Sequence, residues 1–184
     1  MDAMVLGLTL FFGVHALPLL AGVRQQLIGV FGRWFYLGLF SLGSLTGLSL
    51  MLQGYQQIEG KILWPAVGFG HPLAVALMPL ALILIIAAYL PTFIKRKVRH
   101  PMLIGVALWA AVHLLANGDL ASTLLFAPFL AYSLVDMLLT KARKTLIPVR
   151  KPQLYYDILA VIFGLMAYGA LLLSHGHLFG AALL

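Results

Sequence analysis

Six long apolar segments divide this chain, and they constrain its fold more than any other feature of the sequence. A helix needs ~20 apolar residues to cross the hydrocarbon layer of a membrane, and isolated strands would leave backbone groups unpaired in lipid. The segments also lack the alternation of polar and apolar residues that a transmembrane barrel shows. We therefore expect an all-α, polytopic transmembrane helical bundle with six spans, forming a single domain over residues 1–184. The segments are roughly Ala3–Leu20, Trp34–Leu52, Pro72–Leu90, Met102–Ala116, Leu120–Leu139 and Leu154–Ser174.

The composition excludes the main alternatives to a membrane protein. Hydrophobic residues make up 62% of the chain and charged residues only 9%, whereas a soluble domain is about a quarter charged. A globule of this size could not hide so much apolar surface from water. The absence of cysteine also excludes a disulfide scaffold.

The basic residues are distributed unevenly between the loops. With six spans, all but one of the 12 Lys and Arg residues lie in the loops after the first, third and fifth spans, and only Lys61 lies on the other side. The positive-inside rule then predicts that both termini face outside and that the three basic loops are cytoplasmic, as in a multi-pass protein of the bacterial inner membrane. Anionic headgroups explain the net charge of +7, so we expect membrane lipid and no nucleic acid as a partner. The basic loop residues are Arg24, Arg33, Lys95, Arg96, Lys97, Arg99, Lys141, Arg143, Lys144, Arg150 and Lys151.

Local patterns predict how the helices pack and end. Gly43 and Gly47 form a GxxxG pattern, which favours close helix packing within the bundle over a dimer interface. The turn Asn117-Gly118-Asp119 should place Asp119 as the cap of the fifth span. Pro18 should kink the first span.

Two further patterns concern the membrane surface. The segment Val23–Phe31 has an apolar helical face and is either a short amphipathic helix on the membrane or a loop. Aromatic residues near the span ends predict an interfacial belt; these are Trp34, Tyr36, Tyr55, Trp64, Tyr89, Tyr155 and Tyr156.

Two histidines, His15 and His113, lie inside apolar runs, where a polar side chain is a functional hypothesis by default. Counted from Arg24 and Arg99 at ~1.5 Å per residue, they lie about 14 Å and 21 Å deep in a ~30 Å hydrocarbon layer. Two neutral imidazoles at similar depth on different helices suit axial ligation of haem b iron, with Arg24, Arg33 or Arg99 in reach of the propionates. The alternative is that each histidine is a structural hydrogen-bonding residue.

The surroundings of His113 can be predicted from its own helix. Asn117 lies one turn later and could orient the imidazole of His113. Gly105 lies two turns earlier and would leave room for a flat ligand. Alternatively, Trp109, one turn before His113, is core packing, and Asn117 belongs only to the turn.

The segment from Arg99-His100-Pro101 through Trp109 and His113 to Asp119 resembles the signature of the NnrU family, and Phe11-Phe12-Gly13-Val14-His15 fits the family's first helix. The resemblance covers essentially the whole chain. The family is similar to plant 15-cis-ζ-carotene isomerase, an integral membrane enzyme that uses haem b. That similarity implies haem ligands at His15 and His113, with His100 as the competing second ligand.

The resemblance implies an activity as well as a cofactor. It points to cis–trans isomerisation of a polyene such as a carotenoid, with a redox-dependent exchange of one histidine ligand for the substrate. The family name also links it to nitrite and nitric oxide reduction. That link makes a non-catalytic haem or nitric-oxide-responsive accessory protein the alternative.

A more distant resemblance concerns membrane methyltransferases. Arg99-His100-Pro101 followed by Gly105 resembles the part of isoprenylcysteine and phospholipid methyltransferases that holds S-adenosylmethionine. Those enzymes carry acidic residues after the following span, but residues 140–145 here read Thr-Lys-Ala-Arg-Lys-Thr. A positive loop is a poor host for a sulfonium, so an S-adenosylmethionine-dependent methyltransferase is the third alternative.

The predicted orientation can be tested with reporter fusions. We expect alkaline phosphatase fused after Leu184 to be active in the periplasm, because six spans return the chain to the side on which it starts. A fusion after Lys97 should be inactive, because that loop is cytoplasmic by its charge. A cytoplasmic signal at the C-terminus would contradict the six-span count.

Overall fold

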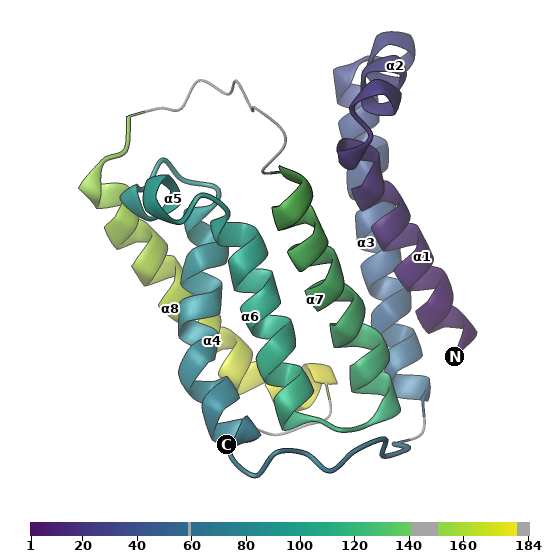
Figure 1. Cartoon of the computed structure of the whole chain (residues 1–184), viewed down its shortest axis with the longest axis vertical. Coiled ribbons are helices and arrows are strands. Elements are labelled where there is room, and N and C mark those ends of the chain that lie inside the picture. The colour runs from purple at the N-terminus through teal and green to yellow at the C-terminus, as the bar shows by residue number, and fades with distance from the viewer. Residues whose placement is uncertain (59, 141–150, 180–184) are drawn as a thin grey trace. The chain divides into compact units, whose positions relative to one another are not determined.

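The computed structural model describes residues 1–58, 60–140 and 151–179, and the regular secondary structure of this part of the chain is helical apart from a single β-bridge between Ile62 and Asp119 (Figure 1). The all-α prediction is therefore confirmed. The α-helices are α1 (Asp2–Ala16), α2 (Ala21–Phe31), α3 (Arg33–Gln57), α4 (Gly70–Ala87), α5 (Phe93–Val98), α6 (Pro101–Ala116), α7 (Leu120–Thr140) and α8 (Leu154–Phe179), and a 3-10 turn, η1 (Leu17–Leu19), follows α1.

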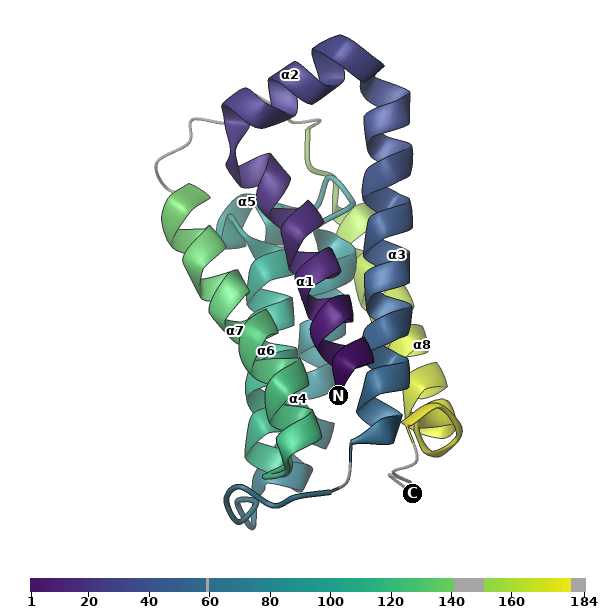
Figure 2. The same ribbon diagram turned by 90° about the vertical axis from the view of Figure 1, so that its right-hand side faces the viewer.

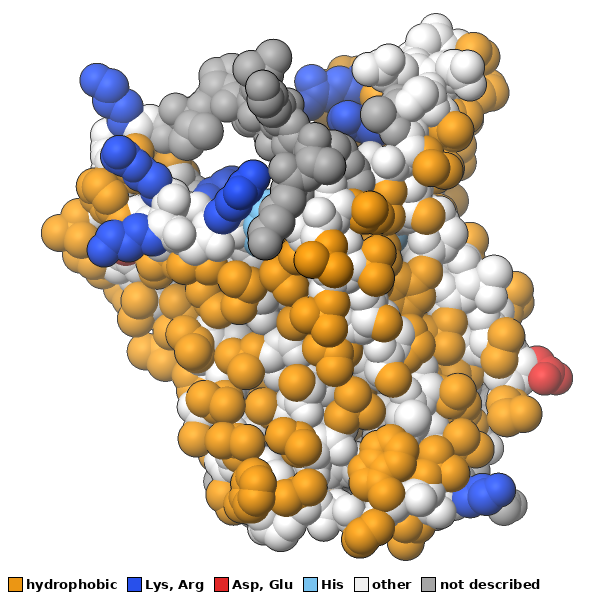
Figure 3. Space-filling model, in the orientation of Figure 1, with side chains coloured by type: hydrophobic (Ala, Val, Ile, Leu, Met, Phe, Trp, Pro, Cys, Tyr) orange, Lys and Arg blue, Asp and Glu red, His pale blue; other side chains and the backbone are white. Residues whose placement is uncertain are grey.

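A helix forms at each of the six apolar runs, and large apolar side chains cover the flanks of these helices (Figure 3). Among the described residues, five helical segments are long and apolar enough to cross a membrane. The exception, α6, has 16 residues and a length of about 24 Å. The chain is thus a multi-pass membrane protein whose helices contact lipid, while the six-span count and the outward termini stay predictions.

The chain forms two compact units. The first comprises Met1–Leu63 and Asp119–Pro128, and the second comprises Trp64–Gly118 and Phe129–Leu184. The boundary inside α7 falls at Pro128, a residue that cannot donate a backbone hydrogen bond. This division does not test the single domain, which stays a prediction.

In the first unit, α1 and α3 run alongside each other and α2 connects their ends (Figure 2). Glycines bring the two long helices into backbone contact. A Cβ added to Gly7 would lie 2.6 Å from the Met51 nitrogen, and one added to Gly47 would lie 2.9 Å from the Phe11 nitrogen. A Cβ added to Gly43 would instead meet the side chain of Val14, at 2.9 Å. The GxxxG prediction of packing within the bundle is therefore confirmed.

Pro18 ends the first helix, so the prediction of a kinked span is wrong at this point. Because Pro18 has no N–H to donate to the Val14 carbonyl, that carbonyl accepts instead from the N–H of Leu17, and α1 stops at Ala16. The chain then turns at Leu20, with φ −97° and ψ 79°, and α2 begins at the next residue. Of the two interpretations of 23–31, the structure supports the helix.

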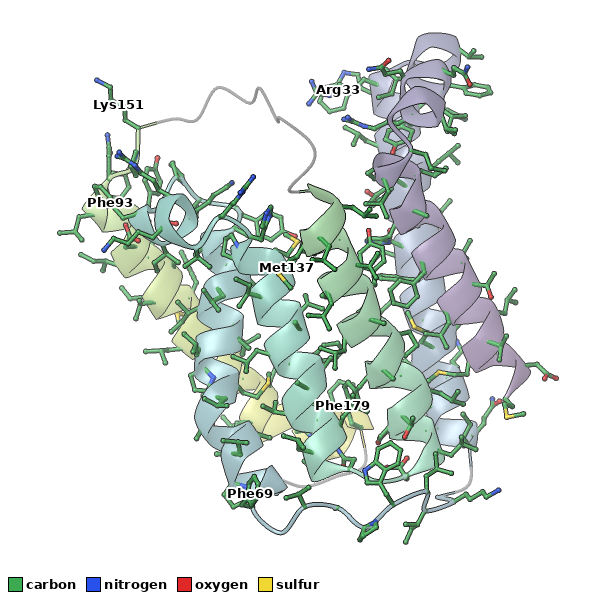
Figure 4. The ribbon with its side chains drawn as sticks, in the orientation of Figure 1. Arg33, Phe69, Phe93, Met137, Lys151 and Phe179 are labelled. Carbon is green, nitrogen blue, oxygen red and sulfur yellow. The ribbon has the colours of Figure 1, made fainter. Side chains whose placement is uncertain are left out.

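In the second unit, α4 packs against both α6 and α8. Gly164 of α8 lies so close to α4 that an added Cβ would be 2.6 Å from the Ile83 side chain. The Tyr168 hydroxyl donates to the Val75 carbonyl over 3.1 Å, which ties α8 to α4 again. Figure 4 shows Phe93 and Lys151 at one end of this unit and Phe69 at the other.

Hydrogen bonds hold the connections at the other end of these helices. The Val67 N–H donates to the Leu115 carbonyl over 3.1 Å, and the Trp64 N–H donates to the Gly118 carbonyl over 3.2 Å, so this stretch of loop is fixed to the end of α6. In the first unit, the Asp119 carboxylate accepts from the Ser122 N–H over 2.8 Å. The predicted cap of the helix that follows the turn is therefore confirmed.

The contact between α1 and α3 predicts a sharp difference between two glycines of one helix. Gly7→Leu should lower the free energy of unfolding by about 3 kcal/mol, because the new side chain would overlap the backbone of α3. Gly13→Leu is the matched control, since a Cβ there meets nothing within 4 Å. Thermal unfolding in detergent, followed by circular dichroism, measures both. Equal stability of the two variants would contradict the packing.

Candidate functional site

His15 occupies the last turn of α1, and its imidazole has a defined orientation. Its Nδ1 lies 2.8 Å from the carbonyl oxygen of Phe11, one turn earlier. A carbonyl can only accept, so Nδ1 carries the proton and the neutral ring keeps its lone pair on Nε2. Nε2 is therefore the atom through which this histidine can ligate a metal.

Two phenylalanines pack against the His15 ring. The Phe11 ring stacks on it with centroids 4.0 Å apart and an interplanar angle of 19°. Phe40 of α3 tilts against it at 4.9 Å. These contacts restrict ring rotation and surround the imidazole with apolar surface.

His113 repeats the arrangement of His15 on α6. Its Nδ1 lies 2.7 Å from the carbonyl oxygen of Trp109, one turn earlier, so Nε2 again keeps the lone pair. The Trp109 ring lies 5.7 Å from the imidazole, and it also packs against Phe129 in a T-shaped arrangement with ring centroids 5.3 Å apart. The sequence alone did not predict that a backbone hydrogen bond of the same kind orients each of the two histidines.

Asn117 agrees with the alternative interpretation, in which it belongs to the turn, whereas Gly105 differs from the prediction. The side-chain amide of Asn117 donates to the backbone carbonyl of His113 over 2.9 Å, so it closes the end of α6 rather than orienting the imidazole. A Cβ added to Gly105 would lie 2.6 Å from the Ala81 carbonyl oxygen. The space beside Gly105 is therefore filled by α4, and the prediction that it leaves room for a flat ligand is wrong.

The depth comparison of the two histidines also needs correction. It assumed a straight helix from His15 to Arg24, but α1 ends at Ala16 and Arg24 belongs to α2. The residue count between them does not measure depth. His15 is one residue from the C-terminal end of α1, and His113 is three residues from the C-terminal end of α6.

His100, the competing ligand, precedes the first turn of α6 as its N-cap residue. Its Nε2 is buried and has no hydrogen-bond partner among the residues described. A buried nitrogen in this state has lost hydration without gaining a partner, which costs free energy. Arg99 before it has the positive φ of 62° that turns the chain from α5 into α6, and its side chain is exposed.

Asp157 of α8 anchors the helix that leads to Arg99 and His100. Its two carboxylate oxygens accept from the N–H groups of Phe93 and Ile94, each over 3.0 Å, at the start of α5. Thr92 adds a cap by accepting from the Lys95 N–H over 2.9 Å. A carboxylate is favourable at a helix N-terminus, so Asp157 has a structural role and positions this segment.

The structure brings only some of the predicted site residues together. In the second unit, His113 of α6 contacts both Trp109, one turn earlier, and Asn117, the residue that caps the helix. His15 belongs to the first unit, as do Arg24 and Arg33, whose side chains are exposed. Within residues 1–58, 60–140 and 151–179, no group of three or more His, Asp or Glu residues is arranged to hold a metal ion. Haem iron takes only one or two protein ligands, so each histidine is judged by its own geometry.

Tyr36 is the residue whose environment the sequence analysis missed. It was expected in the interfacial belt, but it is 7% exposed and its hydroxyl has no partner in the described structure. One signal was present in the sequence. Tyr36 and Phe40 continue the helical face of Gly43 and Gly47 by two turns toward the N-terminus of α3, and that face packs on α1.

The fold and the composition together define a multi-pass membrane protein of apolar helices. The family model described as NnrU protein matches residues 3–183, and the chain belongs to this family. Neither the curated proteins nor the solved structures gave a match to the chain. The basic loop residues Lys141, Arg143, Lys144 and Arg150, and most of the segment 140–145 that argues against methyl transfer, lie outside the described residues.

The anchoring of α5 by Asp157 can be tested separately from any ligand. Asp157→Ala should lower the free energy of unfolding by about 1 kcal/mol, the usual cost of losing a helix cap, and trypsin should cleave faster after Lys95, Arg96 and Lys97. Asp2→Ala, a change at the first residue of the exposed start of α1, is the control. An unchanged cleavage rate in Asp157→Ala would show that the carboxylate does not hold α5.

Proposed function

We propose that this protein binds haem b in a bacterial inner membrane, with His15 and His113 as its axial ligands. The observation that carries the proposal is the shared geometry of the two imidazoles. In each, a backbone carbonyl one turn earlier accepts from Nδ1 and leaves the lone pair on Nε2. Metal-ligating histidines commonly donate their other ring N–H to such a carbonyl, which sets the tautomer and the ring orientation.

The neighbouring residues are compatible with an apolar macrocycle. Phe11 and Phe40 line the His15 ring, and Trp109 lines the His113 ring. Aromatic side chains offer the flat apolar surface that a porphyrin needs, and they exclude water from it. The exposed guanidinium groups of Arg24, Arg33 and Arg99 are suited to pair with propionates.

His100 is the rival for the second ligand, and two observations favour it. Its buried Nε2 would gain a partner by binding iron. His100 also lies at the N-terminal end of α6 and His15 lies near the C-terminal end of α1, and the predicted orientation assigns both of these helix ends to the cytoplasmic side. His113 lies near the opposite end of α6. The orientation of its imidazole therefore favours His113 as the second ligand, whereas the predicted position at the cytoplasmic end of α6 favours His100.

For an activity, we propose cis–trans isomerisation of a polyene such as a carotenoid, on the basis of the family's resemblance to the carotene isomerases. The chemistry that bound haem would supply is a redox-dependent change in iron ligation. The chain's own contribution is to hold each imidazole in one tautomer and to keep its surroundings apolar, so that a membrane-soluble hydrocarbon can approach. The family name supports the alternative, a non-catalytic haem or nitric-oxide-responsive accessory protein.

The absorption spectrum of the purified protein tests the cofactor. After expression with adequate haem supply, we expect a Soret band that is lost or strongly weakened in both His15→Ala and His113→Ala, because each variant removes one axial ligand. His71→Ala is the matched control, since His71 has an exposed side chain at the start of α4 and is not a proposed ligand, and it should keep the spectrum.

The possible outcomes separate the hypotheses. A protein that stays free of haem would overturn the proposal. If His100→Ala loses the band while His113→Ala keeps it, the second ligand is His100 and the cofactor assignment stands. A change in the isomer composition of membrane carotenoids on expression would favour the isomerase. Dependence of nitric oxide turnover on the protein would favour the accessory role.

A further inference from the structure

The first unit contains an apolar cavity that the proposed haem ligands do not line. Its volume is about 260 Å³, and its lining residues come from α1, η1, α2 and α3. Half of them are aromatic: Phe31, Phe35, Tyr36 and Phe40. Pockets for drug-sized ligands measure ~300–1,000 Å³, so this cavity matches a single substituted ring better than a porphyrin or a whole lipid.

Tyr36 is the polar member of this otherwise apolar wall. Its side chain is 7% exposed, and its hydroxyl is buried with no hydrogen-bond partner among the described residues. Buried hydroxyl groups in proteins are almost always hydrogen-bonded, and an exception calls for an explanation. A ligand that brings a hydrogen-bond acceptor into the cavity would provide one.

We propose that this cavity binds the head ring of a membrane quinone, with the Tyr36 hydroxyl donating a hydrogen bond to a ring carbonyl. A quinone ring is planar, so it can pack against the aromatic rings of Phe31, Phe35 and Phe40. Its carbonyl oxygens are acceptors, as the hydroxyl requires. The cavity is not fully enclosed, so an apolar tail can leave it.

The main competitor for the cavity is the acyl chain of a lipid. An acyl chain would fill the apolar volume, but its tail has no acceptor and would leave the Tyr36 hydroxyl unsatisfied. The ester carbonyls of a lipid belong to its headgroup, where they are hydrated. The buried hydroxyl therefore favours the ring carbonyl.

A binding titration in detergent tests the proposal. The probe is a benzoquinone with a decyl tail, and saturable quenching of tryptophan fluorescence reports its binding. Decylbenzene, which has no carbonyl, is the control ligand. We expect Tyr36→Phe to weaken quinone binding about tenfold, because it removes one buried hydrogen bond. Leu27→Phe should weaken binding further by filling the cavity, since Leu27 is part of its lining.

The matched control variant is Tyr55→Phe on the same helix. It also removes a phenolic hydroxyl, but that hydroxyl already bonds Ser122 over 3.0 Å and lies outside the cavity lining. It should bind the quinone as the unchanged protein does. A second readout is the infrared band of a ¹³C-labelled quinone carbonyl, which should shift to lower frequency in the unchanged protein and not in Tyr36→Phe.

The proposal would be overturned by no saturable binding, by equal affinity in Tyr36→Phe, or by equal affinity for decylbenzene, which would indicate an acyl-chain site. His15→Ala distinguishes this site from the proposed haem site. Quinone binding that persists in His15→Ala supports a separate site, even if the haem proposal fails. Loss of quinone binding together with haem would show that the cavity belongs to the haem site and would also overturn the proposal.

Discussion

The first unit depends on the backbone contact between α1 and α3. No hydrophobic force draws helices together within lipid, because lipid tails are as apolar as the side chains. Glycines at positions 7, 47 and 54 instead let the two backbones meet, and dispersion contacts then accumulate along the seam. Phe11, His15 and Phe40 lie along the same pair of helices. The orientation of the His15 ring is thus a product of helix packing as much as of its own hydrogen bond.

Patterns that act within one helix were predictable from the sequence. The apolar runs located six helices, Gly43 and Gly47 identified the packed face of α3, and Asp119 was recognised as a cap. Each depends on a short stretch of chain and on rules that hold in any membrane. The overall helical architecture follows from them because lipid leaves the backbone few other ways to satisfy its polar groups.

Features that depend on a neighbouring element were not predictable in this way. Pro18 predicts a disturbed helix, but the sequence does not predict the direction of the chain after it. In the structure α2 follows a turn at Leu20 and packs against α3 and η1. The sequence around Gly105 shows no neighbour that would fill the space beside it, but in the structure α4 occupies that space. A tyrosine near the end of a span is typical of the membrane interface, but Tyr36 is buried by its neighbours in the first unit.

The shortness of α6 has a consequence for the membrane itself. A helix of about 24 Å is mismatched with a ~30 Å hydrocarbon layer, and such mismatch is relieved by thinning the bilayer or by covering the helix end with protein. The bonds from Trp64 and Val67 to the end of α6 provide such a cover. They place loop backbone within one turn of His113, so polar backbone groups at this end of α6 are satisfied by the protein itself and need no water beside the imidazole.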